Sequence, residues 1–244
     1  MINSSATYDM LSDDYDDMVD KTRDYSQVGK VLSDFIGDRR TLLEVGVGTG
    51  LVVKALLDIN PNYEIWGIDN HQPLLDQAKA KFDAADNVQF HLQDVLNLSL
   101  PKTFDVAYSR GGASMFINTP DGCWFASHLS GRENNLKSLK LIAEHLEDGG
   151  LFIINADRYR NYDNELKEGV VHHRRIEQQT IDGEDYMVFD LSISHNQKVV
   201  NRQVLKLFLL SYQDAKELFM EAGLTPVSIE ADGSFHIYTK GAAQ

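Results

Sequence analysis

Residues 42–57 constrain this chain more than any other part of its sequence. The apolar run Leu42-Leu43-Glu44-Val45 is followed by glycines at positions 46, 48 and 50, and a second apolar run begins at Leu51. This pattern predicts a strand, a tight loop and a helix, with glycines that let the backbone come close to a ligand. The dinucleotide fingerprint G-x-G-x-x-G would need its third glycine at Leu51. The glycine spacing therefore predicts a nucleotide-binding loop of a different kind. A purely structural turn is the alternative.

The segments after this loop alternate between strand-like and helix-like patterns, which predicts parallel βαβ units in a doubly wound sheet. The expected strands are 41–46, 63–69, 88–92, 104–109 and 151–155, and the helices between them end near 59, 82 and 146. Helix 212–222 and strands 225–230 and 234–239 are expected to finish the chain.

Two further segments flank or interrupt this pattern. Residues 1–40 are rich in acids but carry helical spacing, so helices are expected near 12–20 and 25–36, the second packed on the core. Between about 166 and 210 the apolar period becomes two, and Asp182-Gly183 has the chemistry of a hairpin turn. The expected domains are an N-terminal helical lid (1–40), a core (41–160 and 211–244) and an antiparallel β insert (161–210) that acts as a substrate lid.

Composition narrows the class of partner. A formal charge of −14 without a basic stripe argues against nucleic acid and favours a neutral or cationic small molecule. The single cysteine, Cys123, excludes an intramolecular disulfide or a cysteine zinc site, so a reducing cytoplasm is the expected location. No apolar run reaches the roughly 18 residues of a membrane span, and no signal peptide is expected.

Two acids follow the second and third expected strands. Asp69 ends strand 63–69 some twenty residues after the glycines, where an acid can accept hydrogen bonds from ribose hydroxyls. Helix capping is an equally good explanation for an aspartate followed by Asn70 and Pro73. Asp94 follows strand 88–92 and precedes the apolar Val95.

These features in register resemble the successive motifs of class I S-adenosylmethionine (SAM) methyltransferases. The resemblance rests on residues 42–50, Trp66-Gly67-Ile68-Asp69, Gln93-Asp94-Val95, Phe104-Asp105-Val106-Ala107 and Leu146-Glu147-Asp148-Gly149-Gly150. It implies a Rossmann-like α/β fold with a seven-stranded mixed sheet in the order 3-2-1-4-5-7-6, whose last strand is antiparallel. It also implies SAM as cofactor, with Asp69 on ribose and Asp94-Val95 at the adenine.

The flanks are similar to the small-molecule branch that includes amino-sugar N-methyltransferases and glycine N-methyltransferase. Asp14-Tyr15-Asp16 and Arg23-Asp24-Tyr25, together with the insert after strand five, carry this similarity. It implies that Tyr15 and Tyr25 close over SAM near the transferring methyl, where an aromatic face attracts a sulfonium. Packing of these rings against the core is the alternative. The cofactor-binding residues expected from the resemblance are Tyr15, Tyr25, Glu44, Gly46, Val47, Gly48, Gly50, Asp69, Asn70, Leu74, Asp94, Val95, Ser109 and Arg110.

One family feature is missing, because the histidine expected after strand four has no equivalent in Ser109-Arg110-Gly111-Gly112. His128 is the first candidate for a base or substrate-orienting group, and Tyr15 is the second residue placed at the reaction. Arg110 is expected to meet the SAM carboxylate or an acidic substrate group, or else an acid of the chain. His172 and His173 are adjacent on a strand, so at most one of them can face the cavity.

The sequence therefore predicts a SAM-dependent methyltransferase that acts on nitrogen or oxygen of a small natural-product-like molecule. No metal site, nucleic acid or membrane is expected, and a homodimer is left open. Two alternatives keep the SAM site, namely an enzyme of this fold that catalyses cyclisation or rearrangement without methyl transfer, and a non-catalytic SAM-binding subunit. NAD binding is a more distant alternative.

Overall fold

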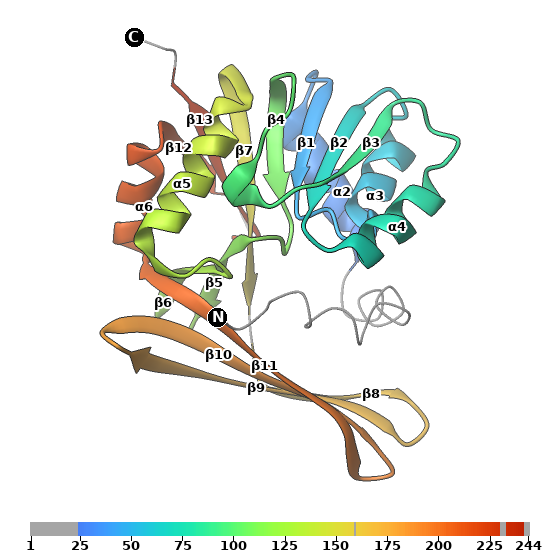
Figure 1. The fold of residues 1–244 in the computed structure, drawn as a ribbon, viewed down its shortest axis with the longest axis vertical. Helices are drawn as coiled ribbons and strands as arrows, with labels where there is room; N and C mark the ends of the chain where they lie inside the picture. Colours follow the sequence, from blue (N-terminus) through green and yellow to red (C-terminus); the bar gives the residue numbers. More distant parts are fainter. Residues whose placement is uncertain (1–23, 159, 230–232, 242–244) are drawn as a thin grey trace.

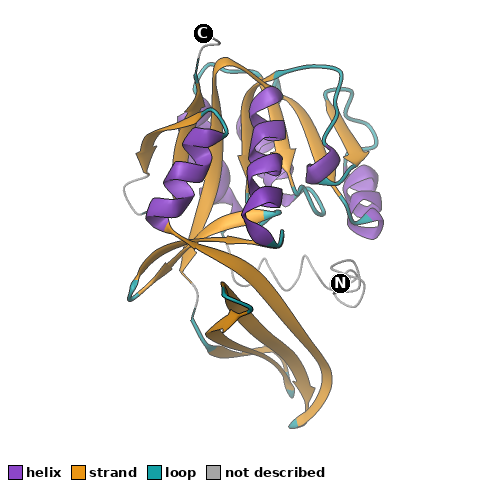
Figure 2. Cartoon of the chain, turned by 60° about the vertical axis from the view of Figure 1, so that its left-hand side comes forward, coloured by secondary structure: helices purple, strands orange, loops and turns teal. Residues whose placement is uncertain are grey.

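The computed structural model describes residues 24–158, 160–229 and 233–241, so the helix expected at 12–20 lies outside the described residues. The described chain is an α/β fold in which one twisted mixed sheet runs through the whole molecule. The first half of the sheet lies between helices, and the second half projects below them as a curved arm of long antiparallel strands (Figure 1, Figure 2).

The first half of the sheet has the predicted parallel core. Its strands are β1 (Thr41–Val45), β2 (Glu64–Asp69), β3 (Val88–Leu92), β4 (Phe104–Ser109) and β7 (Leu146–Arg158), paired in parallel in the order β3-β2-β1-β4-β7. The strand β13 (Phe235–Lys240) pairs antiparallel with β7, and β12 (Leu224–Ile229) pairs antiparallel with β13. The parallel strands and the antiparallel last strand that the sequence predicted are therefore both present.

The helices cover both faces of this half. The helices α2 (Tyr25–Ile36), α3 (Leu51–Ile59) and α4 (Gln72–Lys81) share one apolar cluster with the sheet, and α5 (Gly131–Glu144) and α6 (Tyr212–Glu221) share another. Asp24 caps α2 by accepting a hydrogen bond from the Gln27 amide. Gly29 lets α2 approach α3 closely, because a Cβ there would lie 2.8 Å from the Cβ of Ala55. A short 3₁₀ helix, η2 (Val95–Asn97), follows β3.

The sheet is larger than the seven strands expected, with thirteen strands among the described residues. The added strands are β5 (Ser114–Thr119), β6 (Gly122–Ser127), β8 (Tyr162–Lys167), β9 (Val170–Ile181), β10 (Glu184–His195) and β11 (Lys198–Ser211). They are continuous with the core because β7 runs on beyond it and pairs with β5 through Phe116 and Ala156. Each following strand then pairs antiparallel with its neighbour in the order β5-β6-β11-β10-β9-β8.

Two expected boundaries were wrong. The strand expected at 151–155 begins at Leu146, and the glycines Gly149 and Gly150, expected to close a helix, lie inside it. A register shift between Phe104 and Val106 in the β4–β7 pairing accommodates them, because an irregularity there lets the strand continue past residues that disfavour regular pairing. The preceding helix ends at Glu144 rather than 146.

The hairpin β5–β6 occupies residues for which the sequence pattern predicted no strand. Its signal was present in Pro120-Asp121-Gly122, a turn sequence between two short runs of apolar and aromatic residues. The antiparallel pairing expected for the insert is confirmed, including the Asp182-Gly183 turn between β9 and β10, where both residues have positive φ.

Candidate functional site

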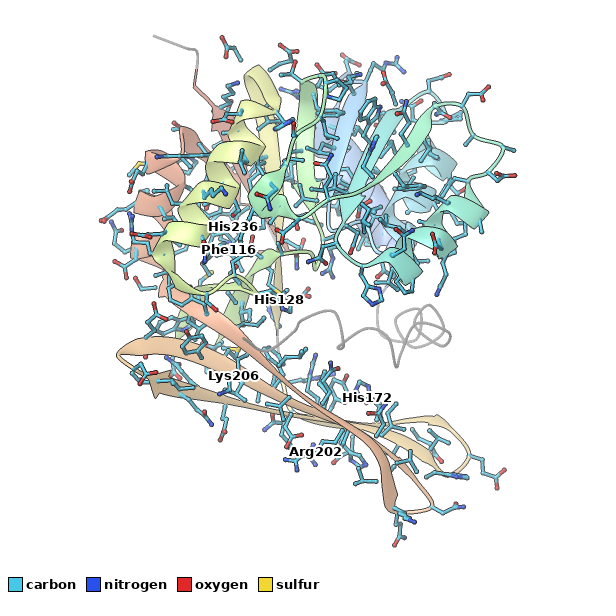
Figure 3. The ribbon with its side chains drawn as sticks, viewed as in Figure 1. Phe116, His128, His172, Arg202, Lys206 and His236 are labelled. Carbon is cyan, nitrogen blue, oxygen red and sulfur yellow. The ribbon has the colours of Figure 1, made fainter. Side chains whose placement is uncertain are left out.

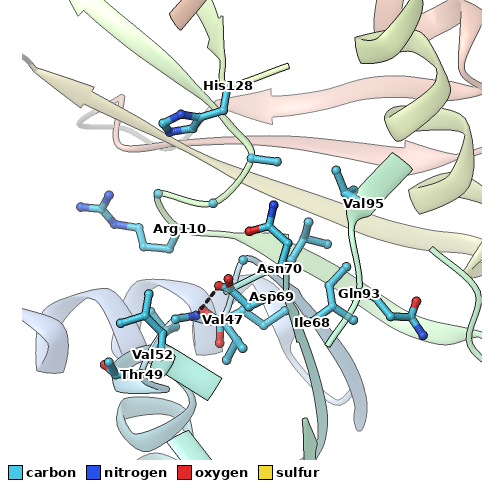
Figure 4. A pocket seen from close by; sticks show the side chains of 18 of the residues that line it. Val47, Thr49, Val52, Ile68, Asp69, Asn70, Gln93, Val95, Arg110 and His128 are labelled. Atoms are coloured by element: carbon cyan, nitrogen blue, oxygen red, sulfur yellow. Dashed lines mark hydrogen bonds between the residues drawn. The ribbon is translucent and has the colours of Figure 1, made fainter. Parts of the chain in front are cut away.

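The candidate site is a pocket at the carboxyl ends of β1, β2, β3 and β4, the edge at which open α/β sheets bind ligands. Figure 4 shows Val47 and Asp69 on one side of this pocket and His128 across from them. The pocket is lined by Tyr25, Glu44, Val45, Gly46, Val47, Gly48, Thr49, Leu51, Val52, Ile68, Asp69, Asn70, Leu74, Gln93, Asp94, Val95, Arg110, Gly111, Gly112, Ala113, His128 and Leu129.

The glycine loop is held in place by hydrogen bonds to the end of β2. The amides of Gly46 and Val47 both donate to the carbonyl oxygen of Ile68 at 2.9 Å, and the amide of Gly48 donates to Oδ2 of Asp69 at 2.8 Å. Gly46 has φ +81° and Gly48 has φ +55°, in the left-handed region where glycine carries no Cβ penalty. The loop is thereby shaped before any ligand arrives.

A second loop, residues 110–113, packs directly against the first. A Cβ on Gly112 would lie 2.2 Å from the carbonyl oxygen of Val45, and a Cβ on Gly46 would lie 2.4 Å from the Cα of Gly112. The two backbones therefore touch at a distance that only glycine allows at both positions. Sequence reasoning missed this contact, although the Gly111-Gly112 pair was a signal for it.

Asp69 accepts hydrogen bonds from two backbone amides at the end of β2. Its Oδ2 holds the glycine loop through Gly48, and its Oδ1 accepts from the amide of His71, the residue that precedes α4, at 2.9 Å. Burial raises the pKa of the Asp69 carboxyl, while the hydrogen bonds from the two amides act in the opposite direction. Each carboxylate oxygen can accept a further hydrogen bond, so this geometry is compatible with a ribose on the pocket side.

Glu44 is a buried acid in the pocket wall, with 1% of its surface exposed. The Tyr108 hydroxyl donates to its Oε2 at 3.0 Å. Burial raises the pKa of the Glu44 carboxyl well above its usual range, the hydrogen bond from Tyr108 lowers it, and the negative charge of Asp69 raises it further. A cation in the pocket would be stabilised by the ionised form of this group.

The strand β7 holds the second loop by two side chains. Arg110 Nη1 lies 3.0 Å from Asp157 Oδ2, with 9% and 18% of the two side chains exposed, and the Gly111 amide donates to Asn155 Oδ1 at 2.9 Å. An ion pair with an acid of the chain was the alternative expected for Arg110. Arg110 lies in the pocket wall, and Asp157 balances its positive charge.

His128 follows β6 and lines the pocket opposite the glycine loop (Figure 4). Its amide donates to the carbonyl oxygen of Ala113 at 2.9 Å, which joins it to the second loop. Desolvation lowers the pKa of His128 to about 4, so its imidazole is neutral near pH 7 and has a nitrogen able to accept a proton.

Most of the expected site residues meet in this pocket, and a few do not. Twelve line it: Tyr25, Glu44, Gly46, Val47, Gly48, Asp69, Asn70, Leu74, Asp94, Val95, Arg110 and His128. Gly50 is absent from the lining and faces Phe82, whose ring would lie 2.8 Å from a Cβ on Gly50. Ser109 is absent as well, because its hydroxyl is buried and donates to the carbonyl oxygen of Val45 at 3.0 Å. Tyr15 lies outside the described residues.

The other histidine candidates are on the arm and do not line this pocket. His173 Nδ1 lies 2.7 Å from Asp163 Oδ1, and its Nε2 lies 2.8 Å from the Ser194 hydroxyl. His172 is buried on the opposite face of β9, with Nδ1 3.2 Å from the Tyr162 hydroxyl. The prediction that the two rings point to opposite faces is confirmed, because His172 contacts Tyr162 whereas His173 contacts Asp163, the next residue of β8.

Within residues 24–158, 160–229 and 233–241, no group of three or more His, Cys, Asp or Glu residues is placed to hold a metal ion. None of the helices in that part of the chain combines the length and apolar character that a bilayer crossing requires.

Residues 42–129 match the family model described as a methyltransferase domain. Among curated proteins, the chain is 33% identical over 98 residues to malonyl-[acyl-carrier protein] O-methyltransferase 1 of Ilyobacter polytropus, covering 37% of each protein. It is 29% identical over 99 residues to the carboxy-S-adenosyl-L-methionine synthase of Campylobacter hominis, covering 38% of this chain and 42% of that protein. These matches thus span less than half of the relatives' length.

Solved structures share the fold over nearly the whole chain. SAM-bound CalS10, an amino pentose methyltransferase from Micromonospora echinaspora, superposes with a TM-score of 0.68 at 16% identity, covering 90% of this chain and 93% of that one. Streptomyces venezuelae DesVI superposes with a TM-score of 0.67 at 17% identity, covering 100% of both. The chain therefore has the class I methyltransferase fold.

Proposed function

We propose that this chain, with its methyltransferase domain at residues 42–129, is a SAM-dependent methyltransferase that modifies nitrogen or oxygen of a small-molecule acceptor. The observation that carries the proposal is the meeting of Gly46–Gly48, Asp69 and Asp94 in one pocket at the strand ends. The glycine loop would hold the methionine part of SAM, Asp69 the ribose and Asp94 the adenine. SAM would supply a methyl group activated by a sulfonium.

The residues around this pocket would orient the two reactants. Methyl transfer is an in-line displacement that depends mainly on alignment, and Tyr25 and Arg110 lie in the pocket wall where they can restrict the reactants. Tyr15 is proposed as a second aromatic group near the methyl. Residues 1–40 and 161–210 are proposed as lids around residues 41–160 and 211–244. The proposal also includes a cytoplasmic location and no nucleic-acid or membrane partner. Measurement of the molar mass in solution would test for a homodimer.

His128 is proposed to accept a proton from the acceptor or to orient it. A His128→Asn variant is expected to lower kcat for methyl transfer by at least about tenfold, because a neutral base contributes when the acceptor starts out protonated. With a pKa of about 4, the contribution of His128 should stay constant as the pH rises above about 5.5 and decline as the pH falls toward 4. SAM affinity, measured by calorimetry, should change less than threefold. If the His128→Asn variant has an unchanged kcat, His128 does not transfer a proton in the reaction.

The function itself is tested by incubating the purified chain with SAM and a panel of small amines and alcohols. The expected result is release of S-adenosylhomocysteine together with a product heavier than its acceptor by about 14 Da, the mass of one added CH₂ unit. Intact SAM binding without any such product from the panel would contradict the proposal. NADH titration followed by fluorescence provides a cheap check against a dinucleotide site.

A second candidate function keeps SAM but not methyl transfer. It is favoured by the similarity to a carboxy-S-adenosyl-L-methionine synthase and by the absence of a histidine after β4. A product without the added methyl mass, formed only when SAM is present, would support this candidate. A non-catalytic SAM-binding subunit would bind SAM and form no product of either kind.

A further inference from the structure

His128 lies on a short connection between two elements. The strand β6 ends at Ser127 and the helix α5 begins at Gly131, so residues 128–130 belong to neither. Figure 3 shows His128 at the junction between the helical half of the molecule and the arm, with Phe116 and His236 on the side of the core. A side chain on such a connection keeps a defined place only if other parts of the chain hold its backbone.

Ser127 holds the backbone on both sides of the pocket wall that carries His128. Its side chain is fully buried, and its hydroxyl donates to the carbonyl oxygen of Ala113 at 3.2 Å and accepts from the amide of Leu129 at 3.0 Å. The same carbonyl oxygen of Ala113 accepts from the His128 amide at 2.9 Å. One hydroxyl thus joins the residue after His128 to the loop 110–113, while Ser127 itself does not line the pocket.

Two asparagines extend this support. Asn135 lies on α5, and its Nδ2 donates to the carbonyl oxygens of Leu129 at 2.9 Å and Gly131 at 2.8 Å. Asn155 lies on β7, and its Oδ1 accepts from the amide of Gly111 at 2.9 Å. The two asparagines therefore fix the segment after His128 and the start of the loop 110–113.

Both asparagines are fully buried, and each leaves one polar atom unpaired. Oδ1 of Asn135 and Nδ2 of Asn155 have no hydrogen-bond partner in the part of the chain that the structure describes. An unpaired buried polar atom costs about 1–3 kcal/mol. That cost offsets part of what each side chain contributes to stability, which favours a role in placing the two backbone segments.

These contacts form a continuous path across the pocket. His128 is bonded to Ala113, and the preceding residue, Gly112, touches Gly46 in the glycine loop on the opposite wall. The distance between His128 and the glycine loop is therefore set by backbone contacts that buried side chains support. Methyl transfer by in-line displacement depends on alignment, and a misplacement of about 1 Å can slow such a reaction roughly a hundredfold.

We propose that Ser127 is a positioning residue for methyl transfer, which fixes His128 at its distance from the glycine loop, and that Asn135 and Asn155 hold the two segments that Ser127 joins. This inference rests on the proposed function, in which SAM lies on the glycine loop and the acceptor lies next to His128. Ser127 touches neither reactant. Its loss should therefore slow the chemical step through His128 and leave the cofactor site intact.

Steady-state kinetics on the full chain test this role with Ser127→Ala. The variant should lower kcat about tenfold, whereas the dissociation constant for SAM should change less than about threefold. In the double variant Ser127→Ala/His128→Asn, kcat should equal that of His128→Asn within about twofold, because Ser127 acts through His128. If the two losses instead multiply in the double variant, Ser127 does not act through His128 and the inference is overturned.

Ser138→Ala is the matched control. Ser138 is likewise buried, and its hydroxyl donates to the carbonyl oxygen of Asn135 at 2.9 Å within α5. The substitution thus removes a buried hydroxyl without releasing residues 128–129, and kcat should stay within about twofold of the natural chain. Equal losses of kcat in Ser127→Ala and Ser138→Ala would show a general effect on packing and would overturn the positioning role.

Hydrogen exchange of the His128 amide, followed by nuclear magnetic resonance, tests the position of His128 without any activity. Ser127→Ala should lower the protection of this amide about tenfold relative to the amides of β1, which report global unfolding, and Ser138→Ala should leave the ratio within about twofold. An unchanged ratio in Ser127→Ala would overturn the inference. If Ser127→Ala does not fold, Asn155→Ala takes its place, since it releases Gly111 and should cause the same loss.

The two readouts separate this inference from the proposed function. A natural chain that forms no methylated product from any acceptor would contradict the proposed function. The exchange of the His128 amide would still decide whether Ser127 fixes the backbone at His128.

Discussion

An Asp69→Ala variant is expected to bind SAM about a hundredfold more weakly than the natural chain. The substitution removes the carboxylate proposed to hold the ribose, and it also leaves the Gly48 and His71 amides without their acceptor. Both effects act on binding, because a loosened glycine loop must be ordered again when the cofactor enters. Titration calorimetry with SAM measures the change directly.

Asp76→Ala is the control for this experiment. Asp76 lies on the next helix, is exposed and accepts a hydrogen bond from Gln72, so its loss removes the same charge without touching the pocket. Its SAM affinity should stay within about twofold of the natural chain. An Asp69→Ala variant that binds SAM as tightly as Asp76→Ala would refute the proposed cofactor placement.

A Gly112→Ala variant is expected to lower the free energy of unfolding by about 3 kcal/mol and to weaken SAM binding. The added methyl group would lie 2.2 Å from the carbonyl oxygen of Val45 and 2.8 Å from the hydroxyl of Ser109. Both contacts are far inside van der Waals distance, and the Val45 carbonyl belongs to the backbone of β1. The two loops must therefore separate, which changes the shape of the pocket wall. Chemical denaturation gives the first quantity and calorimetry the second.

Gly48→Ala separates crowding from backbone strain. Gly48 has φ +55° but no atom within 4 Å of a Cβ, so alanine there meets strain alone, at a cost of about 1 kcal/mol. The stability loss should thus be clearly smaller than for Gly112→Ala. Similar losses in the two variants would mean that the close contact between the loops is not what requires glycine at position 112.

The parallel core could be predicted because its causes are local. Strand and helix periods, the glycines at 46 and 48, and the acid that ends β2 are all visible within short windows of sequence. Parallel strands end at one edge of the sheet, so these windows also predicted that Asp69 and the glycine loop meet. The hydrogen bond from the Gly48 amide to Asp69 was not predicted, because ribose binding and helix capping each explain an aspartate at that position.

The β5–β6 hairpin and the extent of the sheet were not predicted, because they depend on pairing between distant segments. β5 pairs with the far end of β7, some forty residues later, and a short run of apolar residues does not reveal its partner. Ser109 was expected to bind the cofactor from its position at the end of β4, and the structure shows a hydrogen bond from its hydroxyl to the Val45 carbonyl on the adjacent strand.

By itself, the sequence determined the glycine loop, since glycine spacing and strand-end acids specify a loop that can hold a nucleotide-like ligand. Only the tertiary structure decided what surrounds the glycine loop. It brought Gly112 against Gly46, balanced Arg110 with Asp157, and placed His128 across the pocket from the glycine loop. The physical reason is that these relations are distances between side chains and backbones far apart in the chain, set by strand register and packing rather than by local propensity.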